Sequence, residues 1–276
     1  MSDVGPILIT GCSSGIGAAT ARRLAKEGQV VYATARRTET LAAAEAAGCR
    51  TLALDVTDDT SMRAAVDAIV TEHGRVGALV NNAGYGEYGA IEDVAIERVR
   101  RQFETNVIGL SRMCQLVLPS MRAAGRGRIV NIGSMGGRMT FPFGGYYHAT
   151  KHAVEALSDA LRYEVAPFGV QVSLIEPGPI RTEFGATISQ TMKDSTPYGS
   201  PYRESAQAFD KIAARLYETP LMWASADVVA RTIERALTSP RPLSRYVIAR
   251  RVRVALATRM VLPGRAWDAM MRASVR

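Results

Sequence analysis

The stretch Ile7-Leu-Ile-Thr-Gly-Cys-Ser-Ser-Gly-Ile-Gly17 joins a short apolar run to a glycine-rich turn, and residues at helical spacing continue to Glu27. This order predicts a strand, a tight turn and a helix. Glycines at such a junction let the backbone approach a diphosphate, whose charge is met by the free amides at the start of the helix. The spacing differs from Gly-x-Gly-x-x-Gly, and the same glycines also suit an ordinary turn. The stretch favours a dinucleotide-binding fold.

The rest of the chain alternates apolar runs with helical segments. The apolar runs span residues 30–34, 51–54, 78–80, 128–132, 170–175 and 246–248. We therefore predict a single-domain α/β fold over residues 1–276, a doubly wound Rossmann-type parallel sheet of about seven strands with helices on both faces. We also expect one long helix from about Ile91 to Met121 and another from Asp227 to Thr238.

Two segments depart from this alternation. Residues 183–222 are rich in Ser, Thr, Gly and Pro, with a short helical piece near 203–216, and are predicted to form an irregular insertion that acts as a substrate lid. Residues 240–276 form a basic C-terminal extension with nine Arg, no Lys and one acid, which accounts for the whole net charge of +8. We favour a helix there that packs on the chain's own core or on a partner subunit. A basic amphipathic helix on an anionic membrane is the alternative.

Composition narrows the class of protein. We expect no secretory signal, and the sequence has no apolar run of about eighteen residues, so we expect a cytoplasmic protein, with a form peripheral at a membrane as the alternative. Cys12, Cys49 and Cys114 are widely spaced and fit free thiols, with no metal site expected. No nucleic-acid recognition motif accompanies the basic charge, so no nucleic-acid partner is expected.

The candidate chemistry lies between Asn131 and Lys151. Tyr147 and Lys151 are four residues apart, so they share one face of a helix. A neighbouring ammonium is expected to lower the pKa of the phenol and make it a usable general acid or base. Ser134, where a strand ends, is placed to donate a hydrogen bond to a carbonyl oxygen that gains negative charge. Tyr146 is expected to line the pocket, and His148 is expected to take no part in catalysis.

The end of the second predicted strand indicates the cofactor. An acid there would bond the adenosine ribose of NAD(H), but the position holds Ala35, followed by Arg36 and Arg37. Two guanidiniums suit a 2′-phosphate, so NADP(H) is preferred over NAD(H). A basic surface turn is the alternative. Ligands of such sheets bind at the carboxyl ends of the strands, which places Asp55, Val56 and the segment 81–84 near adenosine and ribose.

Together these motifs resemble the short-chain dehydrogenase/reductase family. The matching residues are Thr10-Gly-x-x-x-Gly-Ile-Gly17, Asn81-Asn-Ala-Gly84, Asn106, Ser134, Tyr147-x-x-x-Lys151 and Pro177-Gly178. The sequences Val31-Tyr-Ala-Thr-Ala-Arg36 and Arg245-Tyr246 further resemble the branch that includes 17β-hydroxysteroid and retinol dehydrogenases and related bacterial oxidoreductases.

The resemblance implies a role for each matching residue. Tyr147 would exchange a proton with the substrate oxygen, Ser134 would polarise that oxygen, and Lys151 would bond the nicotinamide ribose and lower the pKa of Tyr147. Asn106 would complete the catalytic set by holding a water that links Lys151 to solvent. The residues expected at the cofactor are Gly11, Ser13, Ser14, Gly15, Ile16, Gly17, Arg36, Arg37, Asp55, Val56, Asn82, Ala83, Gly84, Tyr147, Lys151, Pro177, Gly178, Ile180 and Thr182.

The substrate is expected to be a lipophilic ketone, aldehyde or alcohol. The loop after Ser134 and the lid contain few charged and many apolar residues, which suit a lipophilic ligand. The same apolar residues could instead form the core of the loop. These residues are Met135, Met139, Phe141, Phe143, Ile188, Met192, Tyr198 and Tyr202. The main hypothesis is an NADP(H)-dependent oxidoreductase with Tyr147 as general acid/base. The alternatives are an NADPH-binding sensor without turnover and a membrane-associated form of the enzyme. By analogy with the family we expect a homo-oligomer, a dimer or a tetramer.

Overall fold

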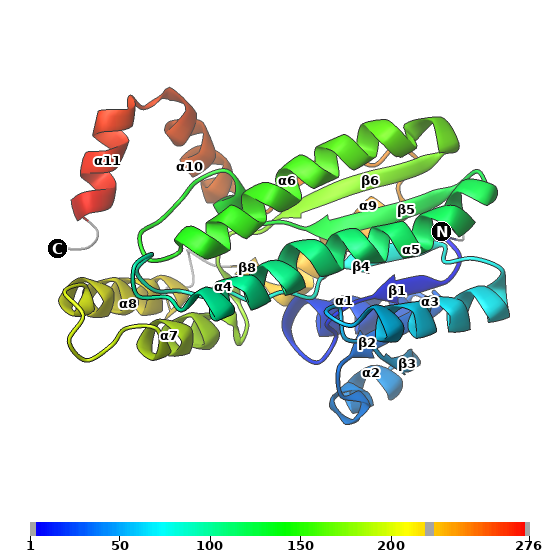
Figure 1. Cartoon of the computed structure of the whole chain (residues 1–276). Coiled ribbons are helices and arrows are strands. Elements are labelled where there is room, and N and C mark those ends of the chain that lie inside the picture. Colours follow the sequence, from blue (N-terminus) through cyan, green and yellow to red (C-terminus); the bar gives the residue numbers. More distant parts are fainter. Residues whose placement is uncertain (1–3, 219–223, 274–276) are drawn as a thin grey trace.

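A computed structural model describes residues 4–218 and 224–273, and its centre is a seven-stranded parallel sheet (Figure 1). The predicted domain, lid and extension each include a few residues outside these ranges, namely 1–3, 219–222 and 274–276. The strand order is β3-β2-β1-β4-β5-β6-β9, and every neighbouring pair is parallel. The strands are β1 (Ile7–Ile9), β2 (Val31–Ala35), β3 (Arg50–Ala53), β4 (Ala78–Asn81), β5 (Gly127–Ile132), β6 (Val170–Glu176) and β9 (Arg245–Val247).

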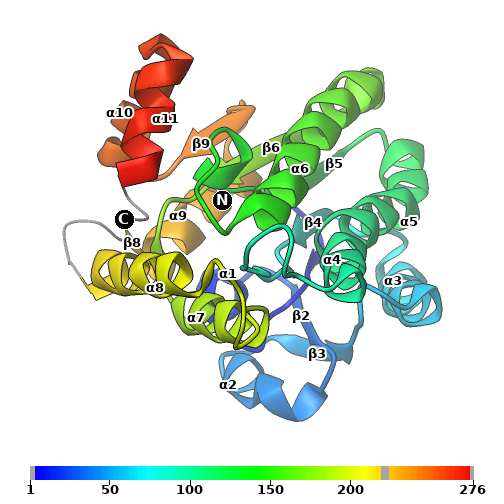
Figure 2. The ribbon, with the colours of Figure 1, turned by 60° about the vertical axis from the view of Figure 1, so that its left-hand side comes forward.

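Helices cover both faces of the sheet, as the strands require. In β1, Ile7 and Ile9 contribute to the core on one face and Leu8 to the core on the other, because successive side chains of a strand point to opposite sides. One face is covered by α1 (Gly15–Lys26) and α9 (Ala226–Thr238), and the other by α3 (Asp59–His73), α5 (Gly109–Ala123) and α6 (Gly145–Val165) (Figure 2). The predicted doubly wound fold is confirmed.

The remaining elements gather mainly at the carboxyl ends of the strands, toward which the arrowheads in Figure 1 point. Two short strands there form a separate pair, β7 (Ile180–Arg181) with β8 (Ala224–Ser225). The other elements are η1 (Thr38–Leu41), α2 (Ala42–Glu45), α4 (Ile96–Phe103), η2 (Glu104–Ile108), η3 (Met135–Gly137), η4 (Ala166–Phe168), α7 (Phe184–Asp194), α8 (Arg203–Glu218), α10 (Arg250–Val261) and α11 (Gly264–Ala273).

The expected continuous helix from Ile91 to Met121 is wrong in two respects. Ala95 is extended, so the helix begins at Ile96, and a π-helical turn interrupts it at η2. The preceding acids are engaged elsewhere: Glu92 accepts a hydrogen bond from the Tyr202 hydroxyl at 2.8 Å, and Asp93 accepts one from Ser200 at 2.6 Å. These tertiary contacts hold the segment before Ile96 in turns instead of a helix.

The helical piece predicted near 203–216 is confirmed by α8, but the rest of the predicted irregular lid is wrong in its local structure, because α7 makes residues 184–194 helical. The Ser and Thr residues that suggested a loop are used for tertiary contacts. The Thr191 hydroxyl, in the middle of α7, donates to the Gly86 carbonyl at 3.1 Å and accepts from the Tyr88 amide at 3.2 Å. Ile188 and Met192 complete the buried side of the helix.

The basic C-terminal extension forms β9, α10 and α11, and its two helices pack on the loop that follows Ser134. Met139, Val252, Leu256 and Trp267 form a buried group, which we call the C-terminal cluster. The rest of α10 does not separate a basic face from an apolar one, because Val261 is 80% exposed. The expected amphipathic pattern is therefore weak in the folded helix. No helix among residues 4–218 and 224–273 is long and apolar enough to cross a membrane.

Candidate active site

The glycine turn between β1 and α1 has the backbone that the sequence indicated. Gly11 and Gly15 have φ values of +72° and +58°, which favour glycine. A Cβ on Gly17 would overlap the Gly11 carbonyl oxygen and the Asn82 side-chain amide. Ser14 makes no side-chain cap and the first turn of α1 carries no acid, so its amides are left for an anion. The turn has room for a diphosphate close to its backbone.

The segment after β4 holds this turn in place through hydrogen bonds from the other side. The Asn82 side-chain amide donates to the carbonyls of Thr10 and Gly11, both at 2.9 Å. The Thr10 hydroxyl accepts from the amides of Asn82 and Ala83, both at 3.0 Å. The opposite wall comes from β7, because Thr182 is the nearest side chain to a Cβ built on Gly15, at 3.4 Å. The structure thus brings the predicted cofactor residues of three segments together.

The residues predicted to surround the adenosine lie at the ends of β2 and β3. Arg36 and Arg37 are exposed, and the 3.8 Å ion pair of Arg37 with Glu39 is exposed as well. Both guanidiniums are free to turn toward an anion, since exposed pairs contribute little. Asp55 is half-buried, and its carboxylate accepts from the Thr57 amide and hydroxyl at 2.9 and 2.8 Å.

Ser134, Tyr147 and Lys151 converge where β5 ends and α6 begins. Ser134 acts on the Tyr147 hydroxyl and lowers its pKa, and its own hydroxyl accepts from the Gly136 amide at 3.0 Å. Lys151 donates to the Ile132 carbonyl at 2.8 Å, and its Nζ lies 5.9 Å from the centre of the Tyr147 ring. Tyr147 is 7% exposed and Lys151 8%, so both reactive groups are shielded from water.

Burial dominates the protonation of this group, and here one expectation was wrong. Desolvation raises the pKa of Tyr147 to about 12, opposed by the hydrogen bond with Ser134. The pKa of Lys151 falls to about 8 through burial, with the carboxylate of Glu155 acting in the opposite direction. The protein by itself therefore does not lower the pKa of the phenol, because the burial of the phenol outweighs the effect of Ser134. Tyr147 is held as a protonated phenol.

Asn106 lies in the π-helical turn η2, a feature often found at functional sites. Its side-chain amide donates to the Tyr85 carbonyl at 2.8 Å and to the Thr150 hydroxyl at 3.1 Å. Its side-chain oxygen accepts from the Tyr85 amide at 3.1 Å. Thr150 in turn donates to the Tyr147 carbonyl at 2.7 Å. Asn106 therefore reaches α6 through Thr150, one residue before Lys151.

An apolar wall stands beside Tyr147, and we call it the aromatic wall. Its members come from the loop after β4, the loop before α6, and α7 and α8. The ring centres of Tyr88 and Phe184 lie 5.7 and 5.5 Å from that of Tyr147. The wall consists of Tyr88, Phe143, Phe184, Ile188, Met192, Ala206 and Phe209. Such a lining suits a lipophilic substrate.

The sequence predicted this wall only in part. Phe143, Ile188 and Met192 are in it, whereas Met135, Met139 and Phe141 contribute to the C-terminal cluster. Tyr198 is 90% exposed, and Tyr202 bonds Glu92 at the surface. Tyr146 also lies apart, with its hydroxyl donating to the Ile91 carbonyl at 3.2 Å. Tyr88, Phe184 and Phe209 were missed, and only the position of Phe184 two residues after Thr182 gave a signal.

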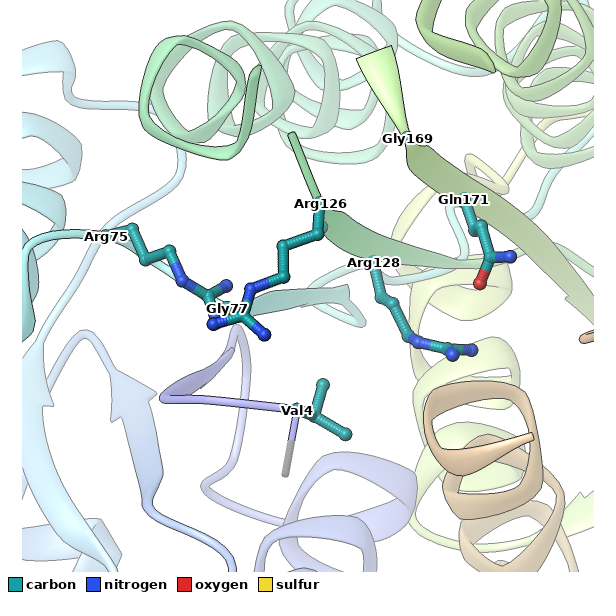
Figure 3. Close-up of a pocket in the computed structure, with 8 residues that line it drawn as sticks. Val4, Arg75, Gly77, Arg126, Arg128, Gly169 and Gln171 are labelled. Carbon is teal, nitrogen blue, oxygen red and sulfur yellow. The ribbon is translucent and has the colours of Figure 1, made fainter. Parts of the chain in front are cut away.

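A cavity of about 200 Å³ lies at the opposite end of the strands, where they begin (Figure 3). Arg75, Arg126 and Arg128 extend toward it in Figure 3. Arg128 donates to the Ala236 carbonyl at 3.1 Å, and Arg126 is exposed. None of the predicted site residues lines this cavity, so it is separate from the candidate active site.

Other reactive groups have little access to the site. Burial raises the pKa of Cys12 and Cys114 to about 12, so these thiols stay protonated and unreactive. Among the residues described, no group of three or more His, Cys, Asp or Glu is arranged to hold a metal ion. The candidate chemistry therefore depends on Ser134, Tyr147 and Lys151.

A family model described as short chain dehydrogenase matches residues 6–193, which include the glycine turn and these three residues. The chain belongs to the short-chain dehydrogenase family. A solved short-chain dehydrogenase from Streptomyces avermitilis is 33% identical, covers 99% of each chain and superposes with a TM-score of 0.80.

Three curated members of the short-chain dehydrogenase family are similar enough to compare. A 3-ketodihydrosphingosine reductase from Bacteroides thetaiotaomicron is 43% identical and covers 74% of this chain and 76% of its own. An NADPH-dependent 3-dehydrocapnine reductase from Ornithobacterium rhinotracheale is 34% identical over 95% of this chain and 94% of its own. Human 17-beta-hydroxysteroid dehydrogenase type 1 is 38% identical over 89% of this chain and 77% of its own. The resemblance to the branch containing 17β-hydroxysteroid dehydrogenases is thus confirmed.

Solved short-chain dehydrogenases include complexes with either nicotinamide cofactor. One from Burkholderia phymatum in complex with NAD is 25% identical, covers 94% of this chain and 95% of its own, and has a TM-score of 0.80. A metagenomic enzyme in complex with NADP is 26% identical, covers 89% and 97%, and has a TM-score of 0.70. The chain is therefore an oxidoreductase of a family that binds NAD or NADP.

Proposed function

We propose that this short-chain dehydrogenase reduces a lipophilic ketone with NADPH, and that Tyr147 is its general acid. The observation that carries the proposal is the meeting of Ser134, Tyr147 and Lys151 beside the aromatic wall. When bound, the reduced nicotinamide supplies a hydride to the carbonyl carbon. Ser134 donates a hydrogen bond to the carbonyl oxygen, and Tyr147 gives its proton to that oxygen as the alcohol forms.

The protonation of Tyr147 favours this direction at neutral pH. A pKa of about 12 keeps the phenol protonated, which is the form that a ketone reduction consumes. For the reverse reaction the phenolate must form, and Lys151 is the cation placed to stabilise it. The same lysine is expected to bond the nicotinamide ribose. Pro177, Gly178, Ile180 and Thr182 would lie against the nicotinamide.

The proposed substrate class is supported by the aromatic wall and by the relatives. The names of the reductases from Bacteroides thetaiotaomicron and Ornithobacterium rhinotracheale each describe the reduction of a 3-keto or 3-dehydro compound. We propose that α7 and α8 cover this substrate as a helical lid, since Phe184, Ile188 and Phe209 belong to the aromatic wall. A ketone with an apolar chain or ring is the first class to test.

Replacing Tyr147 tests the mechanism. Tyr147→Phe should reduce kcat about 100-fold or more, because general acid catalysis contributes roughly that much, while NADPH binding persists. NADPH oxidation should be followed with a panel of lipophilic ketones. Tyr146→Phe is the matched control, because that hydroxyl only bonds the Ile91 carbonyl, and its activity should match wild type. Turnover retained by Tyr147→Phe would remove this mechanism.

The proposed preference for NADPH depends on Arg36. This exposed guanidinium directly follows Ala35, the buried last residue of β2. Ala35 stands where an acid would bond the adenosine ribose of NAD(H). Arg36→Asp should weaken NADPH binding about 10- to 100-fold, the range of a hydrogen bond between charged groups, with a much smaller effect on NADH. Lys26→Asp makes the same charge change at an exposed site at the end of α1. Equal losses for both cofactors would show that Arg36 does not recognise the phosphate.

A further inference from the structure

Arg245, whose guanidinium is half-buried, belongs to strand β9, which lies at the edge of the sheet (Figure 2). Arg245 donates through Nη1 to Glu155 Oε2 and, at 2.9 Å, to Glu176 Oε1, and through Nη2 to Asp159. Glu176 is fully buried and Glu155 is 8% exposed. Carboxylates at this depth need a charged partner, and Arg245 serves both of them as well as the more exposed Asp159.

The acids that share Arg245 belong to the segments that build the site. Glu155 lies on α6 one turn after Lys151, and its charge acts on that lysine. Glu176 ends β6 and directly precedes Pro177 and Gly178, where the nicotinamide is expected. The ion cluster therefore joins the helix of Tyr147 and Lys151 to the cofactor loop.

The same cluster reaches the loop that carries Ser134. The second oxygen of Glu176 lies 3.4 Å from the guanidinium of Arg138, four residues after Ser134. Glu155 packs against both glycines around Ser134: a Cβ built on Gly133 would lie 3.4 Å from Glu155 Oε1, and one on Gly137 would lie 2.8 Å from its Cγ. Displacement of Glu155 would therefore disturb the loop on both sides of Ser134.

We propose that Arg245 is a positioning residue that aligns Ser134, the helix of Tyr147 and the nicotinamide loop through Glu155 and Glu176. This inference rests on the proposed function, because it assigns those three parts to one reaction. Arg245 hydrogen-bonds Glu155 and Glu176, which adjoin the parts of the site, so its effect passes through the two glutamates. Burial raises the pKa of Glu155 and the guanidinium of Arg245 opposes this, so Arg245 also preserves the negative charge that Lys151 faces.

The test compares kcat for Arg245→Met and Arg245→Lys with wild type, using NADPH and ketone at saturation and counting sites by NADPH titration. Arg245→Met should lower kcat about 10- to 100-fold, the range expected for a small misplacement of reacting groups. Arg245→Lys should recover part of this loss, because it restores the charge without the planar fork.

The matched control is Arg23→Met, which breaks a half-buried ion pair with Glu234 between α1 and α9. Its side chain is 32% exposed, close to the 28% of Arg245. Both Met variants should lower the melting temperature, but only Arg245→Met should lower kcat for each folded site. An unchanged kcat in folded Arg245→Met would reduce Arg245 to a structural role and overturn the proposal.

A second variant tests the same proposal in case Arg245→Met does not fold. Glu155→Gln keeps the shape of the side chain and removes its charge, and it should lower kcat in the same direction as Arg245→Met. If Arg245→Met does not fold, a folded Glu155→Gln with wild-type kcat would overturn the proposal.

The affinity for NADPH and the emission of the bound nicotinamide, measured without ketone, separate this inference from the proposed function. Wild type that binds NADPH but reduces none of the ketones would overturn the proposed function. In that case a 2- to 30-fold loss of NADPH affinity in Arg245→Met would still support positioning of the nicotinamide loop. A loss of about this size is typical when a mutated residue is coupled to a binding site through packed side chains. Unchanged affinity and emission would overturn it. Wild type that binds no NADPH would overturn both.

Discussion

His148 is a neutral imidazole packed directly behind Tyr147. It is 3% exposed, and its ring centre lies 5.5 Å from that of Tyr147 and 5.6 Å from that of Phe141. Its Nδ1 is 3.2 Å from the Gly136 carbonyl oxygen, while Nε2 has no hydrogen-bond partner among the residues described. Burial lowers the pKa of His148 to about 4. The ring fills space between α6 and the loop after Ser134, which a charged imidazolium would disrupt.

Because of His148, the folded chain should lose stability in acid. The imidazole titrates near pH 6.5 when unfolded and near pH 4 when folded, so between these values the unfolded chain binds the extra proton. Stability present above pH 6.5 is lost as the pH falls toward 4, by up to about 3 kcal/mol for a shift of this size. His148→Leu should show a shallower fall in the free energy of unfolding between pH 7 and pH 4.5, measured with urea.

His152→Leu is the matched control for this effect, because His152 is exposed on the same helix. Its free energy of unfolding should fall with pH as steeply as that of wild type. The absolute stability of His148→Leu decides nothing, since the substitution also changes packing and removes a hydrogen bond. Equal slopes for His148→Leu and wild type would show that His148 does not resist protonation.

At the scale of secondary structure, buried parallel strands were predictable to within about one residue. They are continuous apolar runs bounded by turn residues. The predicted run 78–80, for example, corresponds to β4 (Ala78–Asn81) in the structure. Helix boundaries were less predictable where polar side chains make tertiary bonds. Asp93 and Thr191 read as ordinary helix and loop residues, but each is held by a partner more than a hundred positions away.

The same reasoning explains which parts of the site the sequence could show. Ser134, Tyr147 and Lys151 lie within eighteen residues, in the loop after β5 and in α6, so local spacing was enough to bring them together. Tyr88, Phe184 and Phe209 reach the aromatic wall from three distant segments, so their spacing in the sequence could not predict that they meet. The raised pKa of Tyr147 was also beyond the sequence, because desolvation depends on what covers the ring.

For the molecule as a whole, the C-terminal cluster decides whether the basic extension belongs to the folded body. Trp267 of α11 packs with Val252 and Leu256 of α10 and with Met139 of the loop that leads from Ser134 to Tyr147. Arg259 also lies over the Trp267 ring, 5.3 Å from its centre. These contacts tie the extension to the catalytic loop. They favour our prediction that the extension packs on its own chain over the alternative of a helix lying on a membrane.

Removing the Trp267 side chain should therefore destabilise the entire fold. Trp267→Ala is expected to lower the free energy of unfolding by about 3 to 5 kcal/mol, the usual cost of truncating a buried Trp, with a single cooperative transition retained. Val261→Ala, at a position 80% exposed, should change it by less than about 0.5 kcal/mol. If Trp267 instead held a partner subunit, the midpoint of unfolding of wild type would rise with protein concentration, and Trp267→Ala would weaken that dependence. Unchanged stability in Trp267→Ala would mean that the extension folds independently of the catalytic body. The contacts of α11 with the Ser134 loop would then contribute nothing to the free energy of unfolding.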